Sequence, residues 1–164
     1  MNYSRDSRMF SLLELILVMV VLAAIVSLTL PRLSGFFEGR KLDSEARRLW
    51  ALSRQAQSTA ISRGQPMQLW YDQDSGNYGL EAVPGFGFEI QGSSYSLPGQ
   101  LTIAPEENQR QGDELTMIWW PDGTVENGDN GWQITSTRLG GQGWVLRQRE
   151  HLATMTLEKL EVVR

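Results

Sequence analysis

The stretch that decides the fold is FSLLELILVMVVLAAIVSLTL, residues 10–30, which contains one charged residue, Glu14. As an α-helix its 21 residues span about 30 Å, enough to cross the hydrocarbon core of a bilayer. Arg5 and Arg8 precede it, and a short basic head before an apolar helix is retained on the cytoplasmic side. From residue 36 onward the chain has 12 basic and 17 acidic residues. We therefore expect this remainder to be exported.

Three interpretations of the apolar helix compete. A cleaved secretory signal has a shorter apolar core and a small-x-small cleavage site, and no such site follows before Pro31. A plain signal anchor fits the hydropathy alone. Glu14 favours an assembly helix, because a carboxylate inside an apolar membrane helix costs roughly 2.5–3.5 kcal/mol and therefore usually has a partner.

The run FSLLEL, beginning at Phe10, resembles the class III signal of type IV pilin-like proteins, and Pro31 stands where family members carry a helix-perturbing proline. The resemblance implies that residues 1–9 are a leader, that a prepilin peptidase cuts between Met9 and Phe10, and that the amino group of Phe10 is then methylated. It also implies that Glu14 meets the terminal amine of a neighbouring subunit, which would lower the desolvation cost of both charges. Proline removes a backbone donor, so we expect a kink or local melting at Pro31.

Met9 departs from the family pattern, which has glycine before the cut. An uncleaved signal anchor therefore stays open as an alternative. A start at Met9 itself would leave no leader at all. The predicted organisation is a leader at residues 1–9, a transmembrane assembly helix at residues 10–35 and a periplasmic domain at residues 36–164.

Residues 36–63 predict an amphipathic helix, because apolar or small residues recur at three- and four-residue spacing. The stripe consists of Leu42, Ala46, Leu49, Ser53, Ala56 and Ala60, flanked by Trp50 and Leu52. We interpret the charged residues between them as a solvated face: Arg40, Lys41, Asp43, Arg47, Arg48 and Arg54. Gly64 and Pro66 predict the end of the helix, with the glycine as a left-handed cap.

In residues 66–164, turn residues separate short apolar segments, a pattern typical of antiparallel β-structure. Alternating apolar residues at 67–71 and 78–82, around the turn residues 74–77, predict a hairpin. Further strand candidates are residues 101–104, 115–120, 132–137, 143–149 and 153–163, and residues 83–100 are expected to form a long connection. We therefore predict an α+β protein, in which a long N-terminal helix precedes a sandwich-like antiparallel domain of about six to eight strands.

The segment WWPDGT, Trp119–Thr124, is similar to a turn typical of minor pseudopilins of the GspH/FimT family. Pro121 presets φ, the Asp122 side chain can cap the turn, and Gly123 accepts a positive φ. Trp119 and its neighbour Trp120 must point to opposite faces of a strand, so one should be buried and the other exposed or covered by a loop.

No pattern predicts catalysis or a bound metal. His151 is the one histidine and there is no cysteine, so neither a zinc site nor a catalytic triad is indicated. The oxygen-rich runs at residues 72–77 and 126–131 could attract calcium, but Asp, Gly and Asn are standard turn residues and the EF-hand glutamate is missing. We expect no enzymatic activity, no metal and no cofactor.

The resemblance implies a minor pseudopilin of a type II secretion system, a structural subunit of a hetero-oligomeric filament that also contains other pseudopilins. Its helix would be stored in the inner membrane, with the N-terminus cytoplasmic and the C-terminal domain periplasmic. The alternative is a minor type IV pilin of the FimT kind that takes part in pilus assembly or DNA uptake. Phosphate binding needs clustered Lys and Arg, for which Arg138, Arg147 and Arg149 are the candidates, and the acidic balance makes nucleic acid an unexpected partner. A membrane-tethered enzyme is a third, weaker alternative.

Overall fold

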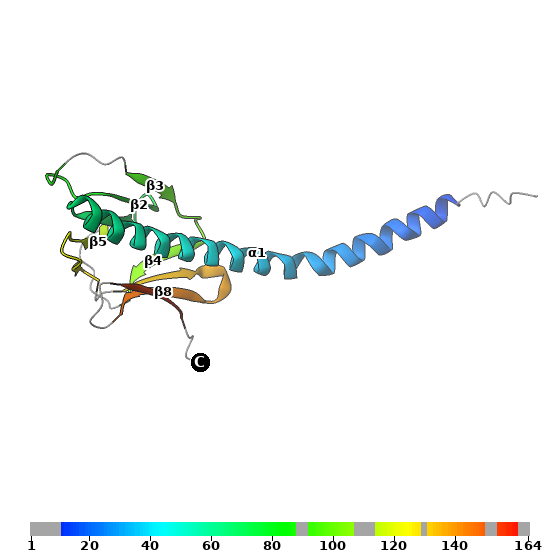
Figure 1. Cartoon of the computed structure of the whole chain (residues 1–164). Coiled ribbons are helices and arrows are strands. Elements are labelled where there is room, and N and C mark those ends of the chain that lie inside the picture. The colour runs from blue at the N-terminus through cyan, green and yellow to red at the C-terminus, as the bar shows by residue number, and fades with distance from the viewer. Residues whose placement is uncertain (1–10, 88–91, 107–113, 129–130, 150–153, 161–164) are drawn as a thin grey trace, which may run out of the picture. The chain divides into compact units, whose positions relative to one another are not determined.

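The computed structural model describes residues 11–87, 92–106, 114–128, 131–149 and 154–160, with the backbone alone for residues 28–34 and 114. Figure 1 shows one long helix, α1 (Leu12–Arg63), followed by short strands. The chain divides into two compact units, one ending at Phe37 and the other beginning at Glu38. The predicted leader, residues 1–9, lies outside the described residues.

The first unit is the N-terminal part of α1. Every side chain described between residues 11 and 27 is exposed, and most of these side chains are large and apolar. Within the part of the chain that the structure describes, no helix combines the length and the apolar character needed to cross a membrane. Pro31 lies inside α1, and the kink expected there stays a prediction.

The second unit begins with the remainder of α1, and its apolar stripe is buried as predicted. Leu42, Leu49 and Leu52 are at most 4% exposed, and the small residues of the stripe are at most 1% exposed: Ala46, Ser53, Ala56 and Ala60. Small side chains let the helix backbone approach the strands closely, so the helix packs into the core instead of resting on it. The helix ends at Arg63, and Gly64 has φ +65°, which confirms the predicted left-handed cap.

The strands form two antiparallel sheets. Sheet A has the order β3-β2-β1-β5-β6, and its strands are β1 (Met67–Asp72), β2 (Asn77–Ala82), β3 (Ser93–Ser96), β5 (Glu114–Trp119) and β6 (Val125–Glu126). Sheet B has the order β4-β7-β8-β9, and its strands are β4 (Leu101–Pro105), β7 (Trp132–Ser136), β8 (Gly143–Gln148) and β9 (Met155–Lys159), with a short 3-10 helix η1 (Thr137–Leu139) after β7.

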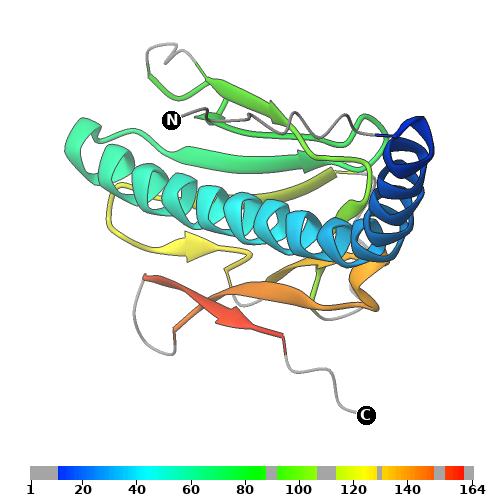
Figure 2. The same cartoon turned by 90° about the vertical axis from the view of Figure 1, so that its right-hand side faces the viewer.

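One hydrophobic core joins the second half of α1 to both sheets. In Figure 2 this half of the helix crosses the molecule with the green strand β2 on one side and the orange and red strands β8 and β9 on the other. In sheet A the register places Leu69 opposite both Leu80 and Met117, so the same face of three neighbouring strands enters the core. In sheet B, Ile103 pairs with Ile134, and both are buried.

The predicted α+β class with antiparallel sheets is confirmed, but the strand number was underestimated. The described residues contain nine strands, including β3 within the segment expected to be a connection and the two-residue β6. The sequence of β3 is SSYS, which has no apolar alternation, and the strand exists because its backbone completes the ladder of β2. Pairing, which no local pattern reports, overrides the low strand propensity here.

Candidate assembly interface

The residues predicted to act in assembly fall at the N-terminal end of α1. Met9 and Phe10, the predicted cleavage and methylation positions, lie outside the described residues. Glu14 lies in the first turn of the helix and is exposed. Its neighbours Leu13 and Leu15 are 75% and 57% exposed, so the Glu14 carboxylate is surrounded by exposed apolar side chains on the helix surface. Such a surface can bury apolar area against other helices and can accept one cation.

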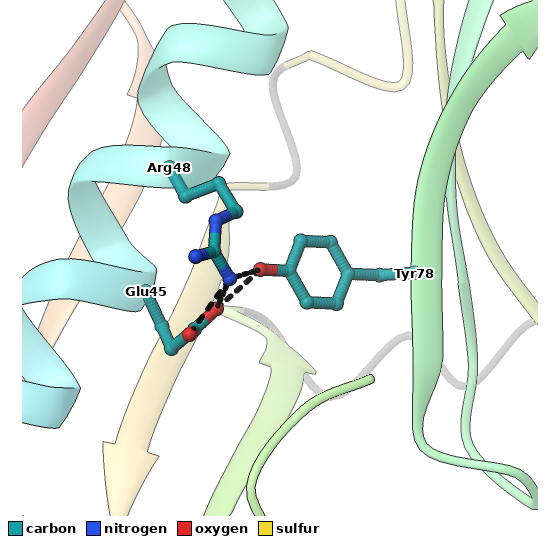
Figure 3. A network of polar contacts seen from close by, with 3 residues as sticks. All are labelled: Glu45, Arg48 and Tyr78. Carbon is teal, nitrogen blue, oxygen red and sulfur yellow. Dashed lines mark hydrogen bonds and ion pairs between the residues drawn. The ribbon is translucent and has the colours of Figure 1, made fainter. Parts of the chain in front are cut away.

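The second half of α1 is held on sheet A by a polar network, shown in Figure 3. Glu45 is only 8% exposed, and its carboxylate accepts a hydrogen bond from the Tyr78 hydroxyl of β2. Arg48, one turn along the helix, donates to both Glu45 oxygens at 2.8 and 2.9 Å and contacts the Tyr78 oxygen at 3.4 Å. The Arg48 guanidinium also lies 4.9 Å from the centre of the Tyr95 ring on β3. A buried carboxylate is costly unless it is paired and hydrogen-bonded, and here it is both.

Burial and the Glu45 carboxylate together raise the pKa of Tyr78 far above its usual value. The phenol therefore stays protonated and acts as a donor toward Glu45 at any physiological pH. The hydrogen bond to Tyr78 is the largest cause that raises the pKa of Arg48, and the charge of Glu45 is a smaller one. The network is thus a fixed arrangement of one negative, one positive and one neutral group, suited to fixing the position of the helix and not to moving a proton.

Four other polar contacts hold the same helix on sheet B and the loops next to it. The Trp144 indole of β8 donates to Asp43 at 2.8 Å, and the Trp50 indole of α1 donates to the Met155 carbonyl of β9 at 3.1 Å. Glu38, 6% exposed, faces the Arg138 guanidinium at 3.5 Å. The Gln100 amide, oriented with its nitrogen toward Glu38, donates to both carboxylate oxygens at 3.1 and 3.0 Å.

Glu38 and Glu45 were missed by the sequence analysis, which treated the charged residues of this helix as a solvated face. Both stand at three- or four-residue spacing from Leu42, so they belong to the buried stripe. An acidic residue in register with an apolar stripe was the available signal. The interpretation holds for the exposed Arg40, Lys41, Asp43, Arg47 and Arg54, whereas Arg48 is half-buried in the network.

The turn after β5 has the predicted geometry. Asp122 accepts hydrogen bonds from the Thr124 N–H at 2.9 Å and the Thr124 hydroxyl at 2.7 Å, which lower the pKa of Asp122. Gly123 has φ +89°. Trp119 is 1% exposed. Trp120 is half-buried and contacts the ring of Phe86 edge to face, with 5.7 Å between the ring centroids. The opposite fates predicted for the two tryptophans are confirmed.

The structure divides the basic residues that were candidates for nucleic-acid binding. Arg138 faces Glu38, and Arg147 forms an ion pair with Glu106. Arg149 is exposed. Two of the three cations are therefore already neutralised by carboxylates of the same chain, which reduces the field that they could offer to phosphates.

The remaining candidates are turns or lie outside the described residues. Asp72 accepts hydrogen bonds from the Asp74 N–H at 2.9 Å and the Ser75 hydroxyl at 2.6 Å, and Gly76 has φ +67°, so this run is the predicted hairpin turn. No group of three or more metal-ligating side chains occurs within the described part of the chain. His151 and residues 129–130 of the second oxygen-rich run lie outside it.

Solved structures that resemble the fold include two minor filament subunits. The minor pseudopilin EpsH of the type 2 secretion system of Vibrio cholerae matches with a TM-score of 0.53 and 15% identity, over 73% of this chain and 96% of that one. The type IV minor pilin FimU of Pseudomonas aeruginosa matches with a TM-score of 0.53 and 17% identity, over 75% and 92%. The fold is that of type IV pilin-like proteins. No protein-family model and no curated protein sequence matches the chain.

The pilin-like fold is the fold that the resemblance of FSLLEL and the WWPDGT turn implied. The identities are too low to carry more than the fold, and the two neighbours come from two different filament systems. Function must therefore be argued from the residues of this chain.

Proposed function

We propose that the chain is a minor pseudopilin, a structural subunit of the filament of a type II secretion system. The observation that carries the proposal is the first half of α1, where apolar side chains are exposed from Leu12 to Val26 around the single charge of Glu14. Contiguous exposed apolar surface of this extent is a site for a membrane or a partner. The pilin-like fold of the remainder is the second support.

In this proposal residues 10–35 are stored in the inner membrane and then pack against the helices of other pseudopilins. The amine of the processed Phe10 of one subunit pairs with Glu14 of its neighbour, so that each charge offsets the desolvation cost of the other. The N-terminus faces the cytoplasm and residues 36–164 face the periplasm. The partners are other pseudopilins and the prepilin peptidase, and the role needs no enzymatic activity.

The polar contacts of Glu38, Asp43, Glu45 and Trp50 support the same role, because a subunit under load must not let its helix slip on its domain. Hydrophobic contacts alone are non-directional. Hydrogen bonds and ion pairs to both sheets fix the register of the helix.

The test is the intact mass of the chain, purified from membranes of cells that co-express a prepilin peptidase. We expect loss of residues 1–9 and gain of one methyl group on Phe10. A Phe10→Ala variant tests whether methylation of the new α-amino group depends on the phenylalanine side chain. An unchanged mass would contradict processing and leave residues 10–30 as a plain signal anchor.

The alternative, a minor type IV pilin, has one specific observation in its favour: FimU matches with the same TM-score as EpsH. Deleting the gene in its host separates the two roles. Loss of protein secretion would support a pseudopilin role, and loss of pilus assembly would support a type IV pilin role. A gel-shift assay of the full chain in detergent tests DNA binding. Retardation that weakens steeply with salt would favour the pilin that takes up DNA.

A further inference from the structure

An open groove of about 460 Å³ lies between α1 and the edge of sheet B. Arg47 and Trp50 line it from α1, Trp144 lines it from β8, and residues 154–157 line it from the start of β9 and the residue before it. Strand β9 is the outer strand of its sheet. The groove therefore has a helix on one side and a strand edge on the other.

The hydrogen bonds between β8 and β9 determine which backbone groups of β9 point outward. The Leu160 N–H donates to the Gly143 carbonyl at 2.9 Å, and the Arg149 N–H donates to the Thr154 carbonyl at 3.1 Å. Bonded and non-bonded pairs alternate along an antiparallel ladder. The residues of β9 whose backbone groups point away from β8 are therefore Met155, Leu157 and Lys159.

Trp50 already uses the first of these outward groups, because its indole N–H donates to the Met155 carbonyl at 3.1 Å. Among the residues that the structure describes, the backbone groups of Leu157 and Lys159 make no hydrogen bond. Two successive outward donor–acceptor sets are thus open to a further strand. An exposed strand edge is a template for pairing with another chain.

Side chains around this edge indicate what would bind. Trp50, Trp144 and Leu157 are half-buried and together form an apolar wall. Arg47 is exposed and has no ion pair among the described residues, and the Arg54 guanidinium lies 5.2 Å from the centre of the Trp50 ring. Arg47 is therefore the charged side chain that lines the groove itself, while the carboxylates next to it are Asp43, which accepts the Trp144 hydrogen bond, and Glu158 of β9.

We propose that an extended acidic peptide segment of a partner protein binds in this groove as an additional strand on β9. The backbone of the segment pairs with Leu157 and Lys159, alternate side chains contact the two indoles, and a carboxylate meets Arg47. The proposal does not depend on the filament role, because every group it uses belongs to the second unit of the chain.

The test uses the full chain in detergent micelles and two short synthetic peptides, one alternating Val with Glu and the other alternating Val with Lys. Binding is followed by tryptophan fluorescence, and amide hydrogen exchange locates it. We expect the Glu peptide to bind and to slow exchange at Leu157 and Lys159, and we expect the Lys peptide to bind much more weakly. Failure of the Glu peptide to bind, or protection elsewhere in the chain, would overturn the proposal.

Two variants separate the charge from the strand edge. Arg47→Glu should weaken binding of the Glu peptide by about fivefold to tenfold, whereas Arg63→Glu, a matched change at the exposed end of the same helix, should not. Leu157→Pro removes an outward donor without removing a bond to β8, and it should abolish exchange protection at Lys159. Near-UV circular dichroism checks that each variant is folded. Equal affinity of Arg47→Glu and the unchanged chain for the Glu peptide would contradict an acidic ligand. Chito-oligosaccharides test a glycan as the occupant. If they quench the tryptophan fluorescence without protecting any amide, the groove binds glycans and the proposal is wrong.

Discussion

The two halves of helix α1 belong to one secondary-structure element and have opposite surroundings. Between residues 11 and 27 every side chain is exposed, although most are apolar. Between residues 42 and 60 the apolar stripe is buried against two sheets of the same chain. The apolar side chains of the second half are buried within the chain, whereas those described in the first half are exposed.

The difference shows why burial, and not hydrophobicity, distinguishes a folding determinant from an assembly determinant. A leucine in the second half stabilises the domain by leaving water. A leucine in the first half contributes nothing of this kind to the isolated chain, and its apolar area becomes useful only in a bilayer or against another helix. Substitutions in the two halves should therefore act on different measurements.

Leu49→Ala should give the largest effect on stability. Leu49 is 2% exposed, and removing a buried leucine costs about 3 kcal/mol through lost burial and the cavity left behind. The measurement is urea unfolding of the full chain in micelles, followed by tryptophan fluorescence. Leu17→Ala, at a position that is 60% exposed, is the matched control and should leave the unfolding free energy unchanged. Equal losses in both variants would erase the contrast between the two halves.

Glu14→Leu should act in the opposite way, leaving domain stability unchanged while impairing assembly. The carboxylate is the one charge of the apolar half, and an uncompensated terminal amine in lipid costs about 3 kcal/mol. We expect normal membrane insertion and a large loss of the chain from filaments, measured by cross-linking to neighbouring pseudopilins. Glu14→Asp, which keeps the charge, should retain most of the incorporation. Normal assembly of the leucine variant would rule out the proposed contact.

Much of this architecture could be predicted because it is determined by local sequence patterns. The stripe from Leu42 to Ala60, the cap at Gly64 and the hairpin around Gly76 each depend on a few neighbouring residues. The long-range features could not be predicted in this way. The bond between Glu45 and Tyr78 joins residues 33 positions apart, and that between Trp50 and Met155 joins residues 105 apart. The edge groove exists only because sheet order leaves β9 outermost.

Tyr78→Phe should produce a moderate loss that depends on pH. It removes the hydroxyl that donates to the buried Glu45, at a cost of about 1–2 kcal/mol. Because the folded state raises the pKa of Tyr78, the phenol contributes stability below its unfolded pKa of about 10, and this contribution is lost as the pH rises above that value. Urea unfolding at neutral and alkaline pH should therefore show a difference between the unchanged chain and the variant that shrinks above pH about 10. A constant difference would mean that the hydroxyl is not buried against Glu45.

Asp122→Asn should have the smallest effect, since Asp122 is exposed in the turn after β5. Asparagine keeps an oxygen that can accept from Thr124, so stability at neutral pH should fall only slightly below that of the unchanged chain. The aspartate differs in its response to acid. Its pKa is lowered in the folded state, so its contribution is present above the unfolded pKa of about 3.9 and is lost as the pH falls below that value. Unfolding midpoints of the two proteins should converge in acid, and parallel midpoints throughout would show that the Asp122 side chain does not hold the turn as an anion.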